Sequence, residues 1–68
     1  MDTFADRLKD LRTDKKLSLK QLAKELGVSD VAIGRWEKLQ RIPNIIELKK
    51  IAEFFNVSAD YLLGLQEF

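Results

Sequence analysis

The sequence has no cysteine and no histidine among its 68 residues. The lack of cysteine excludes disulfides and thiolate metal sites and suits a reducing compartment. The lack of histidine excludes a histidine-ligated zinc site and a histidine general base. No apolar run approaches the roughly 20 residues of a membrane span, and the chain starts Met1-Asp2-Thr3 without the pattern of a signal peptide. We therefore expect a cytoplasmic protein with no cofactor, no metal and no membrane partner.

Glycine and proline are scarce, with three and one residues, which predicts a structure dominated by helices. The length predicts a single domain over residues 1–68, near the lower size limit for an unstapled core. No nucleophile–base pair, metal-ligand cluster or glycine-rich phosphate loop is present. We therefore expect neither an enzyme nor a small-molecule ligand.

The net charge is only +1, but the charges are unevenly distributed. Residues 1–14 hold four acids and three bases, residues 15–50 four acids and nine bases, and residues 51–68 three acids and no base. The three segments therefore carry −1, +5 and −3. A positive middle segment suits the phosphates of a nucleic acid; solvated surface charge is the alternative.

Residues 18–36 predict two short helices joined by a tight turn. Ser18 and Gln21 have the spacing of a capping box at the start of the first helix. Gly27 supplies the left-handed residue that ends this helix, and Ser29 caps the second.

The inner faces of these two helices are predicted to be apolar, consisting of Leu22, Ala23 and Leu26 in the first and Ile33 and Trp36 in the second. A small residue at Ala23 allows the two helices to approach closely where they cross. This combination is typical of a helix-turn-helix, which we place at about residues 19–38.

Two further helices are predicted at the two ends of the chain. The first covers roughly residues 3–15 and is capped by Asp2 or Thr3, with an apolar face of Phe4, Leu8 and Leu11. The last is short, covers residues 58–63 and ends at Gly64.

A fifth helix is predicted between the helix-turn-helix and the last helix. Asn44 and Glu47 have capping-box spacing at its start, and Asn56 or Val57 ends it. Its predicted inner face consists of Ile45, Leu48, Ile51, Ala52 and Phe55.

With these features, the chain resembles the Cro/phage-repressor class of helix-turn-helix domains, also called the xenobiotic-response-element class. The resemblance covers about residues 8–64 and is carried by Leu8-Lys9-Asp10-Leu11-Arg12, Leu17-Ser18, Leu22-Ala23, Leu26-Gly27-Val28-Ser29, Ile33, Arg35-Trp36-Glu37, Pro43 and Phe55-Asn56-Val57-Ser58-Ala59-Asp60-Tyr61-Leu62-Leu63-Gly64. It implies an all-α, compact five-helix bundle of the lambda-repressor-like type. It also implies a homodimeric transcription regulator, a repressor first of all, that binds a palindromic operator in double-stranded DNA.

The resemblance places the helix that starts at Ser29 in the major groove. Val31 would contact thymine methyl groups or is a packing residue, and Asp30 would accept a hydrogen bond from cytosine or support the helix N-terminus. Gly34 permits a close approach of the backbone to DNA or is simply tolerated. The candidates for base reading are Ser29, Asp30, Val31, Gly34 and Arg35.

Candidates for phosphate contact surround this helix: Lys20, Gln21, Lys38, Arg41 and Asn44. Lys20 and Gln21 lie in a first helical turn, where free amides and the helix dipole favour an anion. The family often has glutamine directly after the capping serine. This chain has Leu19 there, so we expect Gln21 to take part of that role.

Arg12 and Glu37 resemble the family's pair that ties the first helix to the end of the reading helix, a structural role that we favour over phosphate binding by Arg12. Apolar residues left over from the core predict a partner surface; these dimer candidates are Phe54, Leu65 and Phe68. The alternative is that Phe68 is a frayed end and Phe54 only half exposed.

A second class of function stays open, a protein-interaction module on the same fold with weak or lost DNA binding, such as an antitoxin or an accessory subunit. The small number of polar groups at Asp30, Val31 and Gly34 favours it.

Overall fold

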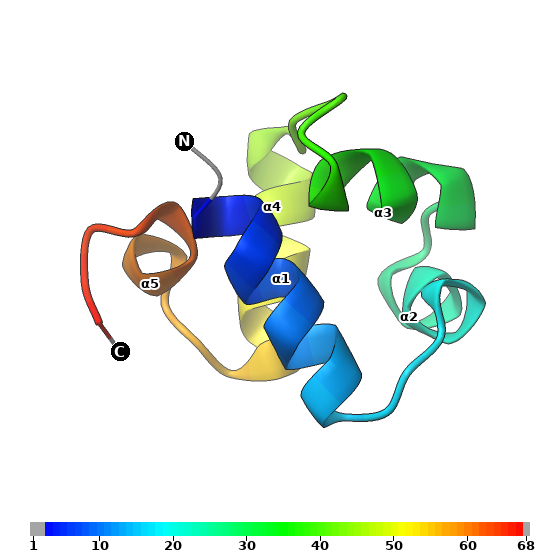
Figure 1. Ribbon diagram of the computed structural model, residues 1–68, viewed down its shortest axis with the longest axis horizontal. Helices are drawn as coiled ribbons and strands as arrows, with labels where there is room; N and C mark the ends of the chain where they lie inside the picture. The colour runs from blue at the N-terminus through cyan, green and yellow to red at the C-terminus, as the bar shows by residue number, and fades with distance from the viewer. Residues whose placement is uncertain (1–2, 68) are drawn as a thin grey trace.

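The computed structural model describes residues 3–67, which form five α-helices and no strand. The helices are α1 (Thr3–Asp14), α2 (Leu19–Leu26), α3 (Asp30–Glu37), α4 (Ile45–Phe55) and α5 (Ala59–Leu63). α1 crosses the middle of the bundle and contacts α3 on one side and α5 on the other, while α2 contacts both α3 and α4 (Figure 1). The predicted all-helical fold is confirmed, although Asp2, one of the two predicted caps of α1, lies outside the described residues.

The helices begin and end where the capping residues predict. The Ser18 hydroxyl accepts a hydrogen bond from the Gln21 backbone N–H at 3.0 Å, and the Gln21 side-chain oxygen accepts one from the Ser18 N–H at 2.8 Å. Asn44 and Glu47 make the same reciprocal pair at the start of α4, at 2.7 and 2.9 Å. Asn56, in the left-handed conformation with φ 55°, ends α4. Because these groups satisfy otherwise unpaired helix termini, both capping boxes are confirmed.

The core lies where the five helices meet, and α5 contributes its fully buried Leu62. Trp36 and Ile33 of α3 are fully buried, as is Leu22 of α2. Ala23 is 5% exposed, as expected for a small residue between two crossing helices. Figure 1 shows α2 nearly end-on while α3 lies across the view, so the predicted helix-turn-helix is present.

The predicted inner face of α4 is wrong at its first residue. Ile45 is 86% exposed, whereas Ile51 and Phe55 are buried, and Leu48 and Ala52 pack against the core from half-buried positions. The reason is that the first turn of α4 extends past the edge of the core. Helical spacing places Ile45 on the correct side of the helix, but there is nothing for it to pack against.

Between residues 3 and 67 no helix has the length and apolar character needed to cross a membrane. The same part of the chain contains no group of three or more acidic side chains that could hold a metal ion.

Candidate nucleic-acid interface

α3 buries one face and exposes the other. Ile33 and Trp36 point into the core, and Ala32 is also buried. The Ser29 hydroxyl accepts a hydrogen bond from the Ala32 backbone N–H at 3.1 Å, which fixes the first turn and leaves the hydroxyl proton to be donated outward. On the opposite face, Val31 is 56% exposed, so the helix presents an apolar group to solvent.

A shallow hollow of about 290 Å³ runs along the exposed face of α3. Leu19, from the start of α2, and Gln40, from the loop after α3, complete its wall. The hollow therefore spans both helices of the helix-turn-helix. The other lining residues are five of the predicted contact residues: Asp30, Val31, Gly34, Arg35 and Lys38.

Two residues of this hollow were not predicted as contacts. In the sequence, Leu19 stands out only as a departure from the family pattern, and no motif or spacing predicts Gln40 as a contact. The only sequence signal for Gln40 is its position two residues after Lys38. A loop residue has no helical periodicity, so its neighbours do not show which way its side chain faces.

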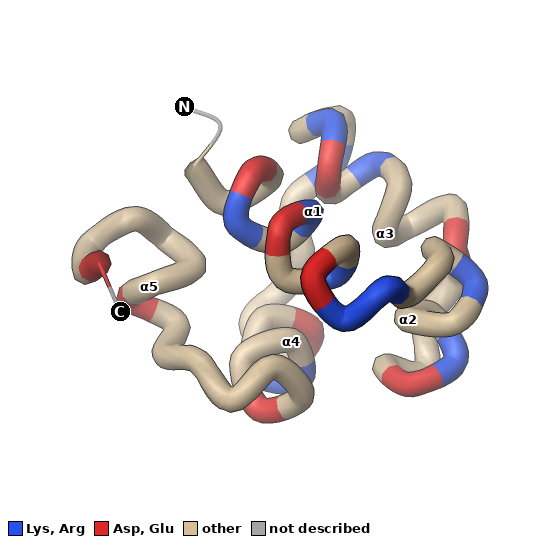
Figure 2. The backbone as a smooth tube through the Cα atoms, turned by 60° about the horizontal axis from the view of Figure 1, so that its bottom comes forward, with Lys and Arg blue, Asp and Glu red and all other residues tan. Residues whose placement is uncertain are grey.

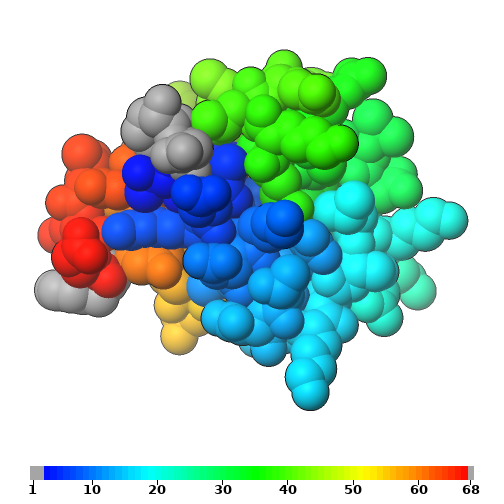
Figure 3. All heavy atoms as spheres, viewed as in Figure 1, coloured from blue at the N-terminus to red at the C-terminus, as the bar shows by residue number. Residues whose placement is uncertain are grey.

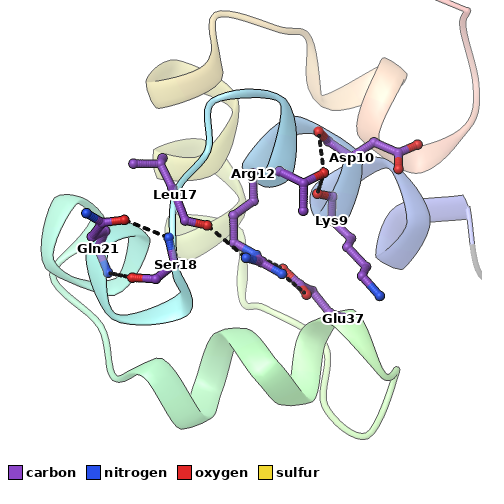
Figure 4. A network of polar contacts seen from close by, with 8 residues as sticks. Lys9, Asp10, Arg12, Leu17, Ser18, Gln21 and Glu37 are labelled. Atoms are coloured by element: carbon purple, nitrogen blue, oxygen red, sulfur yellow. Dashed lines mark hydrogen bonds and ion pairs between the residues drawn. The ribbon is translucent and has the colours of Figure 1, made fainter.

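An ion pair between Arg12 and Glu37 holds α3 against α1 (Figure 4). Arg12 Nε and Nη2 donate to the two carboxylate oxygens of Glu37 at 2.7 and 3.1 Å, and Nη1 donates to the Leu17 carbonyl at 2.8 Å. The side chains are 14% and 8% exposed. The hydrogen bond to Glu37 raises the pKa of Arg12 above its ordinary value. Since all three contacts are internal, Arg12 positions α3 and does not face the hollow.

The predicted phosphate contacts are all exposed, but only Lys38 lines the hollow. Lys20 and Gln21 lie in the first turn of α2, Arg41 in the loop after α3, and Asn44 at the start of α4. None of the hydrogen bonds found within residues 3–67 uses the side-chain amide nitrogens of Gln21 or Asn44, so both remain donors. Figure 2 shows basic positions on α1 to α4 and on the loop after α3, and none on α5.

The predicted dimer candidates do not form an exposed cluster among the described residues. Phe54 is half-buried, packs against the core and makes an edge-on contact with Phe55, with 5.0 Å between the ring centroids. Phe54 therefore follows the alternative interpretation, in which it is only half exposed, and its role in a dimer contact stays a prediction. Leu65 is 72% exposed, and Phe68 lies outside the described residues.

The helix-turn-helix family HTH_3 matches residues 8–62 of the chain. The "HTH-type transcriptional activator BcrR" of Enterococcus faecalis is 45% identical over 64 residues, which are 94% of this chain and 31% of that protein. The "HTH-type transcriptional repressor RghR" of Bacillus subtilis (strain 168) is 36% identical over 64 residues, 93% of this chain and 47% of that protein. The chain thus spans less than half the length of these two relatives.

A solved structure of the phage P22 c2 repressor in complex with a synthetic operator is similar, with a TM-score of 0.85 and 32% identity. The match covers 91% of this chain and 94% of that one. The N-terminal DNA-binding domain of SinR from Bacillus subtilis has a TM-score of 0.82 at 30% identity, with 93% of both chains covered.

Proposed function

The chain belongs to the HTH_3 helix-turn-helix family, and on that premise we propose that it binds double-stranded DNA sequence-specifically and regulates transcription. The observation that carries this proposal is the hollow on α3, which has an exposed apolar floor at Val31 and exposed cations around it. α3 lies in the major groove with its N-terminal residues toward the base edges, and α2 crosses the backbone.

The hollow supplies groups that distinguish base pairs. Val31 packs against thymine methyl groups, and Arg35 donates to guanine O6 and N7. Ser29 donates from its hydroxyl, while Asp30 accepts from cytosine N4. Gly34 lets the backbone of α3 approach the bases closely.

The exposed polar groups around the hollow bind phosphates. Lys20 and Gln21 act together with the free N–H groups at the start of α2. Lys38, Arg41 and Asn44 hold the backbone from the other side of the reading helix. These contacts fix the register of the protein on the duplex, whereas the residues of the hollow determine which DNA sequence is bound.

Two copies bind a palindromic operator as a homodimer, with their reading helices about 34 Å apart. Repression is the simplest outcome, because a protein seated on an operator excludes other proteins from the same DNA. The relatives include an activator and a repressor by name. The main proposal is therefore sequence-specific DNA binding, and the choice between repression and activation is secondary to it.

A protein-interaction module on the same fold is the second candidate function. It is supported by Leu19, which replaces a polar residue common in the family at the edge of the hollow. In such a module Val31 and Leu19 would pack against a protein partner instead of a base.

Selection of bound sequences from random duplex DNA tests the proposal. The selected duplex is then remade with deoxyuridine in place of each thymine in turn, a change that removes only a methyl group. For the parent protein, at least one replacement should weaken binding, and Val31→Ala should abolish that sensitivity. Failure to enrich any sequence would refute the regulator and favour the interaction module.

A further inference from the structure

The apolar part of the hollow on α3 comes from both helices of the helix-turn-helix. Val31 and Gly34 line it from α3, and the half-buried Leu19 lines it from α2. A Cβ built on Gly34 would lie 3.8 Å from Leu19 Cδ1, so these two residues adjoin across the helices. Figure 3 shows the atoms of α2 (cyan) beside those of α3 (green). The hollow therefore has apolar walls on two helices, and a group as small as a methyl can contact both of them.

Asp30 brings an unpaired carboxylate into the same hollow. Its side chain is half-buried, and within residues 3–67 it makes neither a hydrogen bond nor an ion pair. The capping role at this end of α3 belongs to Ser29, whose hydroxyl accepts from the Ala32 N–H. A carboxylate on a surface that meets phosphates is unfavourable unless it finds a donor. In the major groove the bases offer two kinds of donor, cytosine N4 and adenine N6.

The apolar walls distinguish between these two donors. In cytosine methylated at C5, the amino group and the methyl group lie on adjacent ring atoms of one base. In an A·T pair the thymine O4, an acceptor, lies between the adenine amino group and the thymine methyl group. Asp30 and Val31 are consecutive residues that line one hollow, so they match a donor and a methyl group that are direct neighbours.

We propose that the hollow recognises 5-methylcytosine, with Asp30 accepting from N4 while Val31 and Leu19 pack against the C5 methyl group. The inference rests on the proposed function and names the base that satisfies the whole hollow. Unmodified cytosine satisfies the carboxylate alone, and thymine satisfies the apolar walls alone. Thymine also presents the O4 acceptor to the carboxylate, which leaves both groups without a donor.

Leu19 is the residue that makes the second wall apolar. Glutamine, which the family often has at this position, would place a polar amide beside the methyl group. Leucine instead removes water from that side of the methyl group, so the apolar surface that is buried is larger.

Four pyrimidines separate the two contacts. Cytosine, 5-methylcytosine, uracil and thymine combine an amino or a carbonyl group at C4 with a hydrogen or a methyl group at C5. Each is placed in turn at every pyrimidine position of both strands of the selected duplex, opposite the matching purine, and binding of the parent is titrated.

At one position all four affinities should follow from the two contacts. 5-Methylcytosine should bind about fourfold tighter than cytosine, which is the gain from burying one methyl group. It should also bind at least about fivefold tighter than thymine, because Asp30 loses its donor there. Uracil, which has neither group, should bind most weakly.

Three variants and a control assign the contacts. Asp30→Asn has an amide that accepts or donates, so it should lose the preference for 5-methylcytosine over thymine but keep the gain over cytosine. Val31→Ala and Leu19→Gln should lose that gain and keep the preference for cytosine over uracil. Leu65→Ala, at a residue that is 72% exposed and outside the hollow, should keep both. Each result is a ratio of affinities for one variant, so it does not depend on the fraction of that variant that is folded.

Two kinds of failure are distinguishable. A parent whose binding is strengthened by methylation of no cytosine would overturn the inference, as would a methyl gain and an amino preference at different base pairs. An Asp30→Asn variant with the parent's preference for 5-methylcytosine over thymine would overturn it as well. A parent that binds the selected duplex no better than a scrambled one would instead overturn the proposed function.

Discussion

Gly34 is a residue at which folding and the proposed DNA binding make opposite demands. It lies in the middle of α3, where alanine is preferred over glycine by about 1 kcal/mol. A Cβ added there would meet Leu19 Cδ1 at 3.8 Å, an ordinary van der Waals contact. We therefore expect Gly34→Ala to raise the free energy of unfolding by about 1 kcal/mol and the melting temperature by about 4–8 °C.

Gly27→Ala is the matched control for this change. Gly27 ends α2 with a φ of 70°, and an added Cβ would come no nearer than 4.0 Å to Lys50 Nζ. Space is therefore sufficient, but the left-handed backbone penalises any side chain, so this variant should lose about 1 kcal/mol of stability. Thermal and urea unfolding followed by circular dichroism measure both variants. A destabilised Gly34→Ala would refute the reasoning.

For DNA binding, Gly34→Ala is expected to be unfavourable, although the same change should stabilise the fold. Gly34 lines the hollow, so in the proposed complex a methyl group there occupies space that the duplex needs. Forcing a methyl group into a close-packed contact costs about 1–3 kcal/mol, a loss of about 5- to 150-fold in affinity for the selected duplex. Unchanged affinity in a more stable variant would show that Gly34 is only tolerated and that the close approach does not occur.

Two further predictions concern what holds α3 in place. Ala23→Leu adds bulk at the crossing of α2 and α3 and should lower the free energy of unfolding by about 1–3 kcal/mol, measured by urea denaturation; a parent-like midpoint would contradict the placement of the two helices. Glu37→Gln leaves the largely buried guanidinium of Arg12 without its counter-charge and should cost about 3 kcal/mol, whereas replacing both partners with apolar residues of similar volume, Arg12→Met with Glu37→Leu, should recover much of that loss. An equally unstable double variant would show that packing, and not the unpaired charge, sets the cost.

The helices were predictable because the signals that start and stop them act over one turn. Ser18 with Gln21 and Asn44 with Glu47 each satisfy helix termini within four residues of sequence. Ile45 shows the limit of such local signals. Apolar spacing identifies the inner side of a helix, but where the core ends along that helix depends on the neighbouring elements.

The candidate site was predictable where it lies on α3 and less so elsewhere. Val31 and Gly34 follow from their opposition to Ile33 and Trp36 on a helical wheel. The position of Gln40 depends instead on the path of the chain after α3. There Leu39, a left-handed residue that is not glycine, redirects the backbone. No local rule places such a turn at a leucine, whose φ here is 55°, so the wall of the hollow required the structure.

The central claim is that α3 selects the sequence while the surrounding cations hold the phosphates. A salt titration of binding to the selected and to a scrambled duplex tests it most directly. Lys38→Ala should weaken binding to both duplexes similarly and make the slope of log affinity against log salt shallower by about 0.9. Val31→Ala should keep the parent's slope and lose about 1–3 kcal/mol of discrimination. A parent that binds both duplexes equally, or a Val31→Ala that weakens both alike, would contradict the claim.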